Sequence, residues 1–252
     1  MTAKSRYRLL SCNVFRRELL VVLGRTLNLV DPDFLELGLH EKPGALNEAV
    51  QSRIDAASEV IFPGRARYDA ILLGYGLCGN GIAGVEARSL PLVIPRAHDC
   101  CTVLLGSRAD FLSRFGDNLS ASWSSVGCIE GGDSYFRVSE FGRTSESDLE
   151  YAQLVEKYGE ENAAYARDIL SQDSSETELR FIEIPETAGL GYAELMRNKA
   201  LGEGRDFVLI PGSLRLLEGL VAGGWDEAEY LVVRPGERIE PVYDHERVFE
   251  AR

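Results

Sequence analysis

Short, continuously apolar segments alternate with amphipathic segments along this chain, and the alternation restricts the folds that it can adopt. The segment from Tyr68 to Leu73 is apolar at nearly every position, which is typical of a parallel strand covered on both faces. Further strands are expected at residues 7–12, 33–39, 90–94, 179–184, 207–210 and 230–233. Helices are expected at residues 15–27, 46–58, 102–115, 148–171, 192–201 and 214–222. This order predicts an α/β fold with a doubly wound, mainly parallel sheet of the Rossmann-like type.

A change in composition divides the chain near residue 140. Residues 139–148 are rich in Ser, Thr, Gly and charged side chains, which is typical of a linker. We therefore expect one α/β part in residues 1–140 and a second in residues 141–252, either as separate halves or as one compact unit.

The formal charge of −13 is unevenly distributed. Residues 1–128 carry 14 basic and 13 acidic side chains, whereas residues 129–252 carry 13 and 27. A chain with such an acidic part is not expected to bind duplex nucleic acid, because phosphate contacts need a basic face.

The sequence contains no expected membrane span or export signal. The longest purely aliphatic run covers residues 19–23, whereas a span needs about 20 residues. The first residues lack the apolar region and the cleavage site of a secretory peptide. Five cysteines, two of them adjacent, do not suggest a disulfide framework here. We expect a cytoplasmic protein with reduced thiols and no membrane partner.

Thiol and imidazole side chains follow the ends of the first four expected strands. Cys12 ends the first strand, His40 directly follows the second, Cys78 lies in the loop after the third, and His98 and Cys100 follow the fourth. Ligands of an open parallel sheet bind at the carboxyl ends of its strands. In an extended chain, His98 and Cys100 would point the same way. The sequence therefore predicts a metal site with Cys12, Cys78, Cys100 and His98 as ligands.

Two metal groups suit these ligands equally well. Three protein ligands with an open fourth position are typical of a catalytic zinc ion. Three thiolates with one open iron would suit a [4Fe-4S] cluster. Each cysteine taken alone is also explained as a core residue, since cysteine is often buried, and we expect that role for Cys101 and Cys128. His40 is explained equally well as a loop residue and as a site residue.

The loop after the third strand reads Gly74-Tyr75-Gly76-Leu77-Cys78-Gly79, which matches the G-x-G-x-x-G pattern of nucleotide-binding proteins. Only about ten residues separate this loop from the next strand, too few for the usual phosphate-binding helix and crossover. We interpret Gly76 and Gly79 instead as cofactor-binding residues that let the backbone bring Cys78 close to a bulky ligand. Tyr75 either lines the pocket or packs under the loop.

Two charged residues are added to the predicted site. Glu18, in the helix after the first strand, is a candidate general base or a carboxylate that supports the metal ligands. The alternative is a solvated helix acid. Arg96 is a candidate for binding an anionic group of the substrate, and its alternative is an ion pair with the acidic part of the chain. We assign catalytic roles to Glu18, His98 and Arg96.

The stretch Leu73-Gly-Tyr-Gly-Leu-Cys-Gly-Asn-Gly81, together with Ile94-Pro-Arg-Ala-His-Asp-Cys100, resembles a family of bacterial and archaeal proteins with a domain of unknown function. The resemblance implies an association with corrinoid-dependent methyl-transfer systems, and a corrinoid or methyltransferase protein as a partner. The pair His98 and Cys100 is similar to the H-x-C zinc element of thiol methyltransferases. Here Cys12 and Cys78 precede the pair, and no matching cysteine follows far downstream.

These observations predict a metal-dependent enzyme with a zinc ion or a [4Fe-4S] cluster at the carboxyl edge of the sheet. A small-molecule substrate and methyl or thiol transfer in corrinoid-linked one-carbon metabolism fit the resemblance. The alternative is a non-catalytic accessory protein that binds a metal, a cofactor or a corrinoid. A third interpretation is an α/β core in which the cysteines bind nothing.

Overall fold

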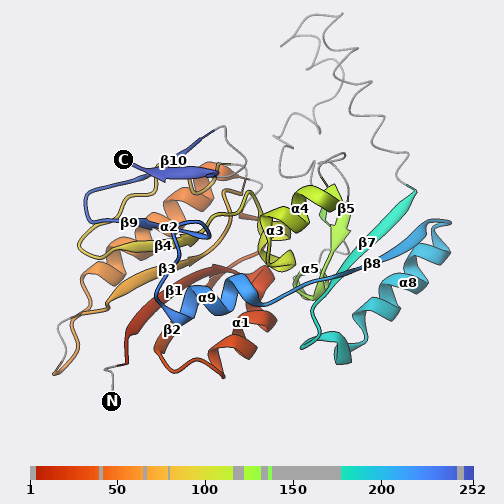
Figure 1. Ribbon diagram of the computed structural model, residues 1–252, viewed down its shortest axis with the longest axis horizontal. Coiled ribbons are helices and arrows are strands. Elements are labelled where there is room, and N and C mark those ends of the chain that lie inside the picture. Colours follow the sequence, from red (N-terminus) through yellow and green to blue (C-terminus); the bar gives the residue numbers. More distant parts are fainter. Residues whose placement is uncertain are drawn as a thin grey trace, which may run out of the picture.

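The computed structural model describes residues 4–39, 42–64, 67–78, 80–115, 122–131, 136–137, 177–242 and 247–252. These residues form two sheets and a two-stranded ribbon, with helices packed around them (Figure 1). None of the helices in this part of the chain has both the length and the apolar character that a membrane span requires.

The larger sheet has the strand order β2-β1-β3-β4-β9. Its strands are β1 (Arg6–Cys12), β2 (Leu29–Leu35), β3 (Ala70–Gly74), β4 (Leu92–Pro95) and β9 (Tyr230–Val233). The first four run parallel, and β9 pairs with β4 in the antiparallel direction. The predicted α/β fold with a mainly parallel, Rossmann-like sheet is confirmed.

Helices cover both faces of this sheet, because successive side chains of a strand point to opposite faces. Leu9 and Leu72 lie in a buried cluster with residues of α1 (Arg16–Leu23) and α9 (Arg215–Ala222). Their neighbours Leu10 and Leu73 lie in a second cluster with residues of α2 (Pro43–Ser58). A short 3-10 helix, η1 (Asn13–Phe15), joins β1 to α1.

The smaller sheet has the order β6-β5-β7-β8. Its strands are β5 (Ser122–Ser124), β6 (Phe136–Arg137), β7 (Glu178–Glu183) and β8 (Asp206–Pro211). Strands β5, β7 and β8 are parallel, and β6 is antiparallel to β5. Between β7 and β8 lie η5 (Ala188–Leu190) and α8 (Tyr192–Gly202).

Three short helices lie where the two sheets meet (Figure 1). They are α3 (Cys100–Leu105), α4 (Arg108–Phe115) and α5 (Val126–Glu130). The strands β10 (Ile239–Pro241) and β11 (Phe249–Ala251) form the antiparallel ribbon near the end of the chain.

Each sheet contains strands from both sides of residue 140. Strand β9 returns to the larger sheet, and β5 and β6 precede this residue but pair within the smaller sheet. The division into residues 1–140 and 141–252 stays a prediction. The linker at 139–148 and the helix at 148–171 lie outside the described residues.

Candidate metal centre

The connections of the larger sheet create a switch point between β1 and β3. From β1 the chain runs through α1 to β2 on one side, and from β2 it returns through α2 to β3 on the other side. Ligands of open α/β sheets bind at such a point, beyond the carboxyl ends of the strands. Cys12 is the last residue of β1, and Cys78 lies in the loop that follows β3. The two thiols therefore flank the preferred binding position of this topology.

The loop after β3 is hydrogen-bonded to the segment after β4. The backbone N–H of Leu77 donates to the carbonyl oxygen of Ala97 at 2.9 Å, and that of Cys78 donates to His98 at 3.0 Å. A Cβ atom on Gly76 would lie 2.7 Å from the backbone nitrogen of Asp99, so glycine is needed for this close approach. The glycine thus brings the loop against its neighbouring segment.

Cys78 has a backbone φ of 48°, in the left-handed region that non-glycine residues seldom adopt. Such a conformation costs free energy and persists where the surroundings impose it, often at functional sites. The two hydrogen bonds to Ala97 and His98 on one side, and the N–H of Gly81 donating to the Cys78 carbonyl at 3.0 Å on the other, hold the turn.

Cys100 is presented by the first turn of α3. Asp99 caps this helix, since its side chain accepts hydrogen bonds from the N–H and the hydroxyl of Thr102 at 2.9 and 3.0 Å. Asp99, between His98 and Cys100, has an extended backbone with φ −154° and ψ 180°, and the helix begins at Cys100. The expectation that His98 and Cys100 point the same way stays a prediction. The chain bends at His98, whose carbonyl accepts from Cys78.

The thiols of Cys12, Cys78 and Cys100, which we call the thiol cluster, influence one another electrostatically. Burial raises the pKa of Cys12 to about 11. Burial also raises the pKa of Cys78, and negative charge on Cys12 raises it further. The pKa of Cys100 is raised by burial first, then by charge on Cys78, and also by Cys12. All five cysteines of the chain are free thiols.

The donor atoms do not surround a single ion. Among the described residues, no group of three or more His, Cys, Asp or Glu side chains is arranged to hold one metal ion. Sulfur ligands of one zinc ion lie within about 4 Å of each other, because each Zn–S bond is only ~2.3 Å. A cluster of several iron ions separates its thiolates more widely. The described thiols therefore do not form a mononuclear site in this arrangement.

Tyr75 and Glu18 each carry a buried polar atom. The hydroxyl of Tyr75 and the Oε2 atom of Glu18 have no hydrogen-bond partner among the described residues. Burial raises the pKa of Tyr75, and charge on Cys12 and Cys78 adds to the effect. Burial likewise raises the pKa of Glu18 to about 7. Glu18 is therefore not a solvated helix acid, and it can hold or release a proton near neutral pH.

Arg96 faces the end of the chain rather than the thiols. Its guanidinium donates to the carbonyl oxygens of Glu227, Arg247 and Phe249 at 2.8, 2.7 and 2.6 Å. The predicted anion-binding role has no support in this geometry, and the alternative of an ion pair is replaced by bonds to backbone oxygens.

His40 and Gly79 lie outside the described residues. Asn13, which directly follows Cys12, has a buried Oδ1 atom without a partner among the described residues, and no pattern in the sequence points to it. Cys128, expected to be only a core residue, has its pKa raised by burial and also by charge on Cys12.

Fold and site together define an α/β protein with free thiols, two buried and one partly buried, at the carboxyl edge of its larger sheet. A family model described as "Protein of unknown function (DUF1638)" matches residues 34–195, and the chain belongs to this family. The matched residues include Cys78, Cys100 and Cys128, whereas Cys12 and Glu18 precede them. No curated protein and no solved structure matches the chain.

Proposed function

We propose that this protein is a metal-dependent enzyme whose metal group is held by Cys12, Cys78 and Cys100. The observation that carries the proposal is the thiol cluster: three free thiols lie at or beyond the carboxyl ends of three adjacent parallel strands, and they raise one another's pKa. Thiolates are the preferred ligands of zinc and of iron–sulfur clusters. His98 serves as a fourth ligand or as a proton carrier.

A [4Fe-4S] cluster is favoured over a zinc ion. Three thiolates with one open iron match the three cysteines of the thiol cluster, and these thiols raise one another's pKa. The raised pKa values mean that the thiols release their protons when a metal binds and not before, so metal binding is expected to release protons. A bound cluster would supply a Lewis-acidic iron for the substrate or a route for electrons.

The chain's own residues supply proton handling and positioning. Glu18, with a pKa of about 7, is suited to accept a proton from a small-molecule substrate or return one to it. Tyr75 offers a hydroxyl without a partner among the described residues. Gly76 and the backbone bonds of Leu77 and Cys78 hold the thiol of the β3 loop in position.

The reaction class is proposed from the resemblance of the glycine–cysteine loop and the Pro-Arg-x-His-Asp-Cys stretch. It favours methyl or thiol transfer linked to corrinoid metabolism in the cytoplasm, with a corrinoid or methyltransferase protein as partner. A non-catalytic carrier of a metal, a cofactor or a corrinoid is the second candidate. It is favoured by one observation: the side chains of Cys78 and Cys100 are each only 5% exposed, which restricts the approach of a substrate.

The test is the metal and sulfide content of anaerobically purified protein, compared for the wild type, Cys78→Ser and Cys101→Ser. Serine keeps nearly the volume of cysteine but is a poor ligand for soft metals. We expect iron and acid-labile sulfide in the wild type, a sharp loss in Cys78→Ser, and wild-type content in the control Cys101→Ser. Thermal unfolding of each variant checks that the fold is retained.

Three outcomes are informative. Zinc without sulfide in the wild type would replace the cluster by a mononuclear ion. A Cys78→Ser protein that is less stable by about 1–3 kcal/mol but unchanged in metal content would identify Cys78 as a core residue. A wild type without bound metal would overturn the proposal.

A further inference from the structure

We propose that Arg108 binds a phosphate group where the turn between α3 and α4 meets the turn between β8 and α9. The ligand is either a free phosphate ion or the phosphate of a small-molecule substrate or cofactor. The site goes beyond the proposed function and does not depend on a bound metal.

The guanidinium of Arg108, the first residue of α4, is partly buried and lacks an acceptor. Its Nη1 atom is shielded from solvent and has no hydrogen-bond partner among the described residues. Asp110 of the same helix forms no described ion pair with it, and Glu229 is paired with Arg215 at 2.8 Å. Buried polar groups are almost always hydrogen-bonded, and a buried charge is costly without a partner. The unused donor therefore points to an anionic ligand.

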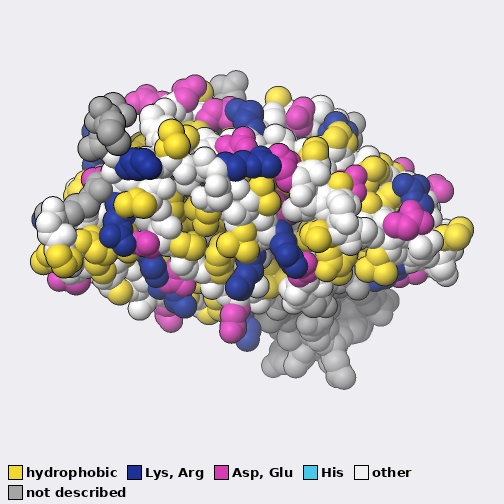
Figure 2. Space-filling view, turned by 90° about the horizontal axis from the view of Figure 1, so that it is seen from below, with side chains coloured by type: hydrophobic (Ala, Val, Ile, Leu, Met, Phe, Trp, Pro, Cys, Tyr) yellow, Lys and Arg dark blue, Asp and Glu magenta, His cyan; other side chains and the backbone are white. Residues whose placement is uncertain are grey.

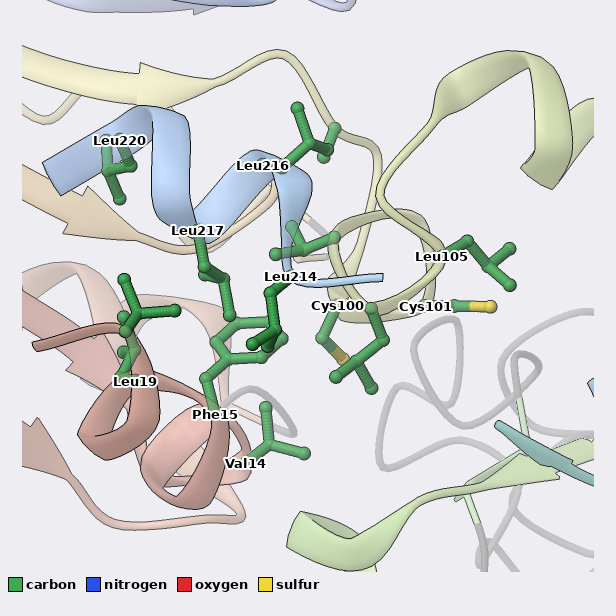
Figure 3. Packing of buried hydrophobic residues seen from close by; sticks show 14 of the residues in the cluster. Val14, Phe15, Leu19, Cys100, Cys101, Leu105, Leu214, Leu216, Leu217 and Leu220 are labelled. Atoms are coloured by element: carbon green, nitrogen blue, oxygen red, sulfur yellow. The ribbon is translucent and has the colours of Figure 1, made fainter. Parts of the chain in front are cut away.

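Close contacts hold the turn between α3 and α4 against the start of α9. The Nε atom of Arg215 donates to the carbonyl oxygen of Gly106 at 2.8 Å. The N–H of Ser213 donates to the carbonyl oxygen of Leu104 at 2.9 Å. A Cβ atom on Gly106 would lie 2.8 Å from the Cβ atom of Ser213. Figure 3 shows Leu214, which directly precedes α9, beside α3. The two turns therefore form one well-packed junction.

Two serine hydroxyls at this junction can donate to the same ligand. The Oγ atom of Ser107 accepts from the N–H of Asp110 at 3.2 Å, and that of Ser213 accepts from the N–H of Arg215 at 3.2 Å. A hydroxyl that accepts still has its own hydrogen to donate, and neither hydrogen has an acceptor among the described residues. Both serines are partly exposed, so a ligand from solution can reach them.

The charge next to Arg108 favours an anion with more than one negative charge. Arg96 donates to three backbone carbonyl oxygens, which leave its positive charge in place. Burial lowers the pKa of Arg96, the charge on Arg108 lowers it further, and the opposing charges of Glu227 and Arg247 contribute less. A phosphate group matches this setting, because its several oxygens accept from a forked guanidinium and from hydroxyls on other sides. A planar carboxylate would be satisfied by the guanidinium alone.

Arg114 provides a matched control. It lies in the last turn of the same helix α4 and is exposed. Replacing either arginine by glutamine removes one positive charge from α4 and keeps a polar side chain. A difference between the two variants therefore reports on the position of the guanidinium and not on the net charge of the protein.

The experiment measures calorimetric binding and thermal unfolding of the wild type, Arg108→Gln and Arg114→Gln. Sodium phosphate, methyl phosphate and sodium acetate are compared with sodium chloride at equal ionic strength, which keeps general screening constant. We expect phosphate to bind and stabilise the wild type and Arg114→Gln, and to bind Arg108→Gln at least about tenfold more weakly. In chloride alone, Arg108→Gln should be as stable as the wild type or more stable, because it loses a buried charge that has no partner.

Each outcome decides one part of the proposal. Methyl phosphate that binds as tightly as phosphate identifies a site for the phosphate group of a larger molecule, whereas binding of inorganic phosphate alone identifies a site for the free ion. A wild type that binds neither, or an Arg108→Gln protein with wild-type affinity for phosphate, overturns the proposal. Acetate that binds as well as phosphate overturns the assignment of the ligand class. If Arg108→Gln fails to fold, Arg108→Lys replaces it, since lysine keeps the charge but lacks the forked donor, and the same comparison decides.

Discussion

Glu18 is a carboxyl group in an environment that opposes its charge. Burial raises its pKa from 4.5 to about 7, so the folded protein binds a proton there that the unfolded chain releases. The stabilising contribution of this proton is complete below pH 4.5 and is lost as the pH rises through 7. One pKa unit corresponds to about 1.4 kcal/mol, which makes the whole effect about 3 kcal/mol.

We therefore predict that Glu18→Gln becomes more stable relative to the wild type as the pH rises. The difference in the free energy of unfolding should change by about 3 kcal/mol in favour of the variant between pH 4 and pH 8. Urea unfolding of both proteins at several pH values measures it. A difference that is the same at every pH would show that folding does not change the pKa of Glu18.

At the residue scale, the sequence predicted the positions of reactive side chains that end or follow a recognisable strand. The positions of Cys12, Cys78 and Cys100 at the carboxyl edge of the sheet could be predicted because each ends or follows a recognisable strand, whereas their role as ligands stays a prediction. The position of Cys128 could not be predicted, because its strand β5 is only three residues long and shows no periodicity. The role of Arg96 was not predictable either, since its partners are backbone oxygens far along the chain.

Close approaches between elements hold the site together, and Gly127 makes the tightest of them possible. Replacing Gly127 by Ala would push its Cβ into the carbonyl group of Val14 and separate α5 from η1. We predict a loss of about 1–3 kcal/mol in the free energy of unfolding, as is usual for overpacking. If metal is bound as proposed, its content should fall too.

Gly202, the last residue of α8, is the control for this substitution. Apart from its chain neighbours and the backbone of its own helix, no described atom lies within 4 Å of a Cβ atom built on Gly202. Gly202→Ala is expected to be neutral or to stabilise by about 0.5–1 kcal/mol, since alanine loses less backbone freedom on folding. Chemical denaturation of both variants gives the comparison. Equal effects at the two positions would contradict the packing argument for Gly127.

At the element scale the errors of prediction have local physical causes. The helix expected at 102–115 is divided into α3 and α4, because Gly106 adopts a left-handed φ of 73° and ends α3. The strand expected at 33–39 is β2, which ends at Leu35. This strand lies at the edge of the sheet, and its Asp31 and Asp33 form ion pairs with Arg6 and Arg8 of β1. Polar side chains and a proline are typical of an edge strand, and they explain why the apolar pattern did not indicate the first residues of β2.

At the scale of the whole molecule, charge and topology have different degrees of predictability. The face in Figure 2 carries basic and acidic side chains side by side, without an area of one sign. Ion pairs between basic and acidic side chains are also found between distant segments, since Arg25 pairs with Glu186 and Glu218. The pattern predicted parallel α/β architecture, but not that β9 would return to the larger sheet. Such long-range pairings leave little trace in a sequence because they depend on surfaces that form only on folding.

Arg96 joins the first part of the chain to its end and is the best single test of that return. Its three bonds to the carbonyl oxygens of Glu227, Arg247 and Phe249 use a planar, forked donor that lysine cannot reproduce. We predict that Arg96→Lys lowers the free energy of unfolding by about 1 kcal/mol, because hydrogen bonds to three carbonyl oxygens are lost, of which the bond to Phe249 is partly buried.

The control is Arg88→Lys, at an arginine that pairs with Asp55 and Glu86 on the surface. Its effect should stay within about 0.5 kcal/mol, because exposed ion pairs contribute little. Thermal unfolding compares the two variants, and limited proteolysis shows whether cleavage near residues 247–252 becomes faster in Arg96→Lys. An Arg96→Lys protein with the stability and cleavage pattern of the control would mean that β9 and the ribbon hold the chain end without Arg96. Accelerated cleavage confined to residues 247–252 would instead show that the hydrogen bonds of Arg96 hold this end of the chain against the larger sheet.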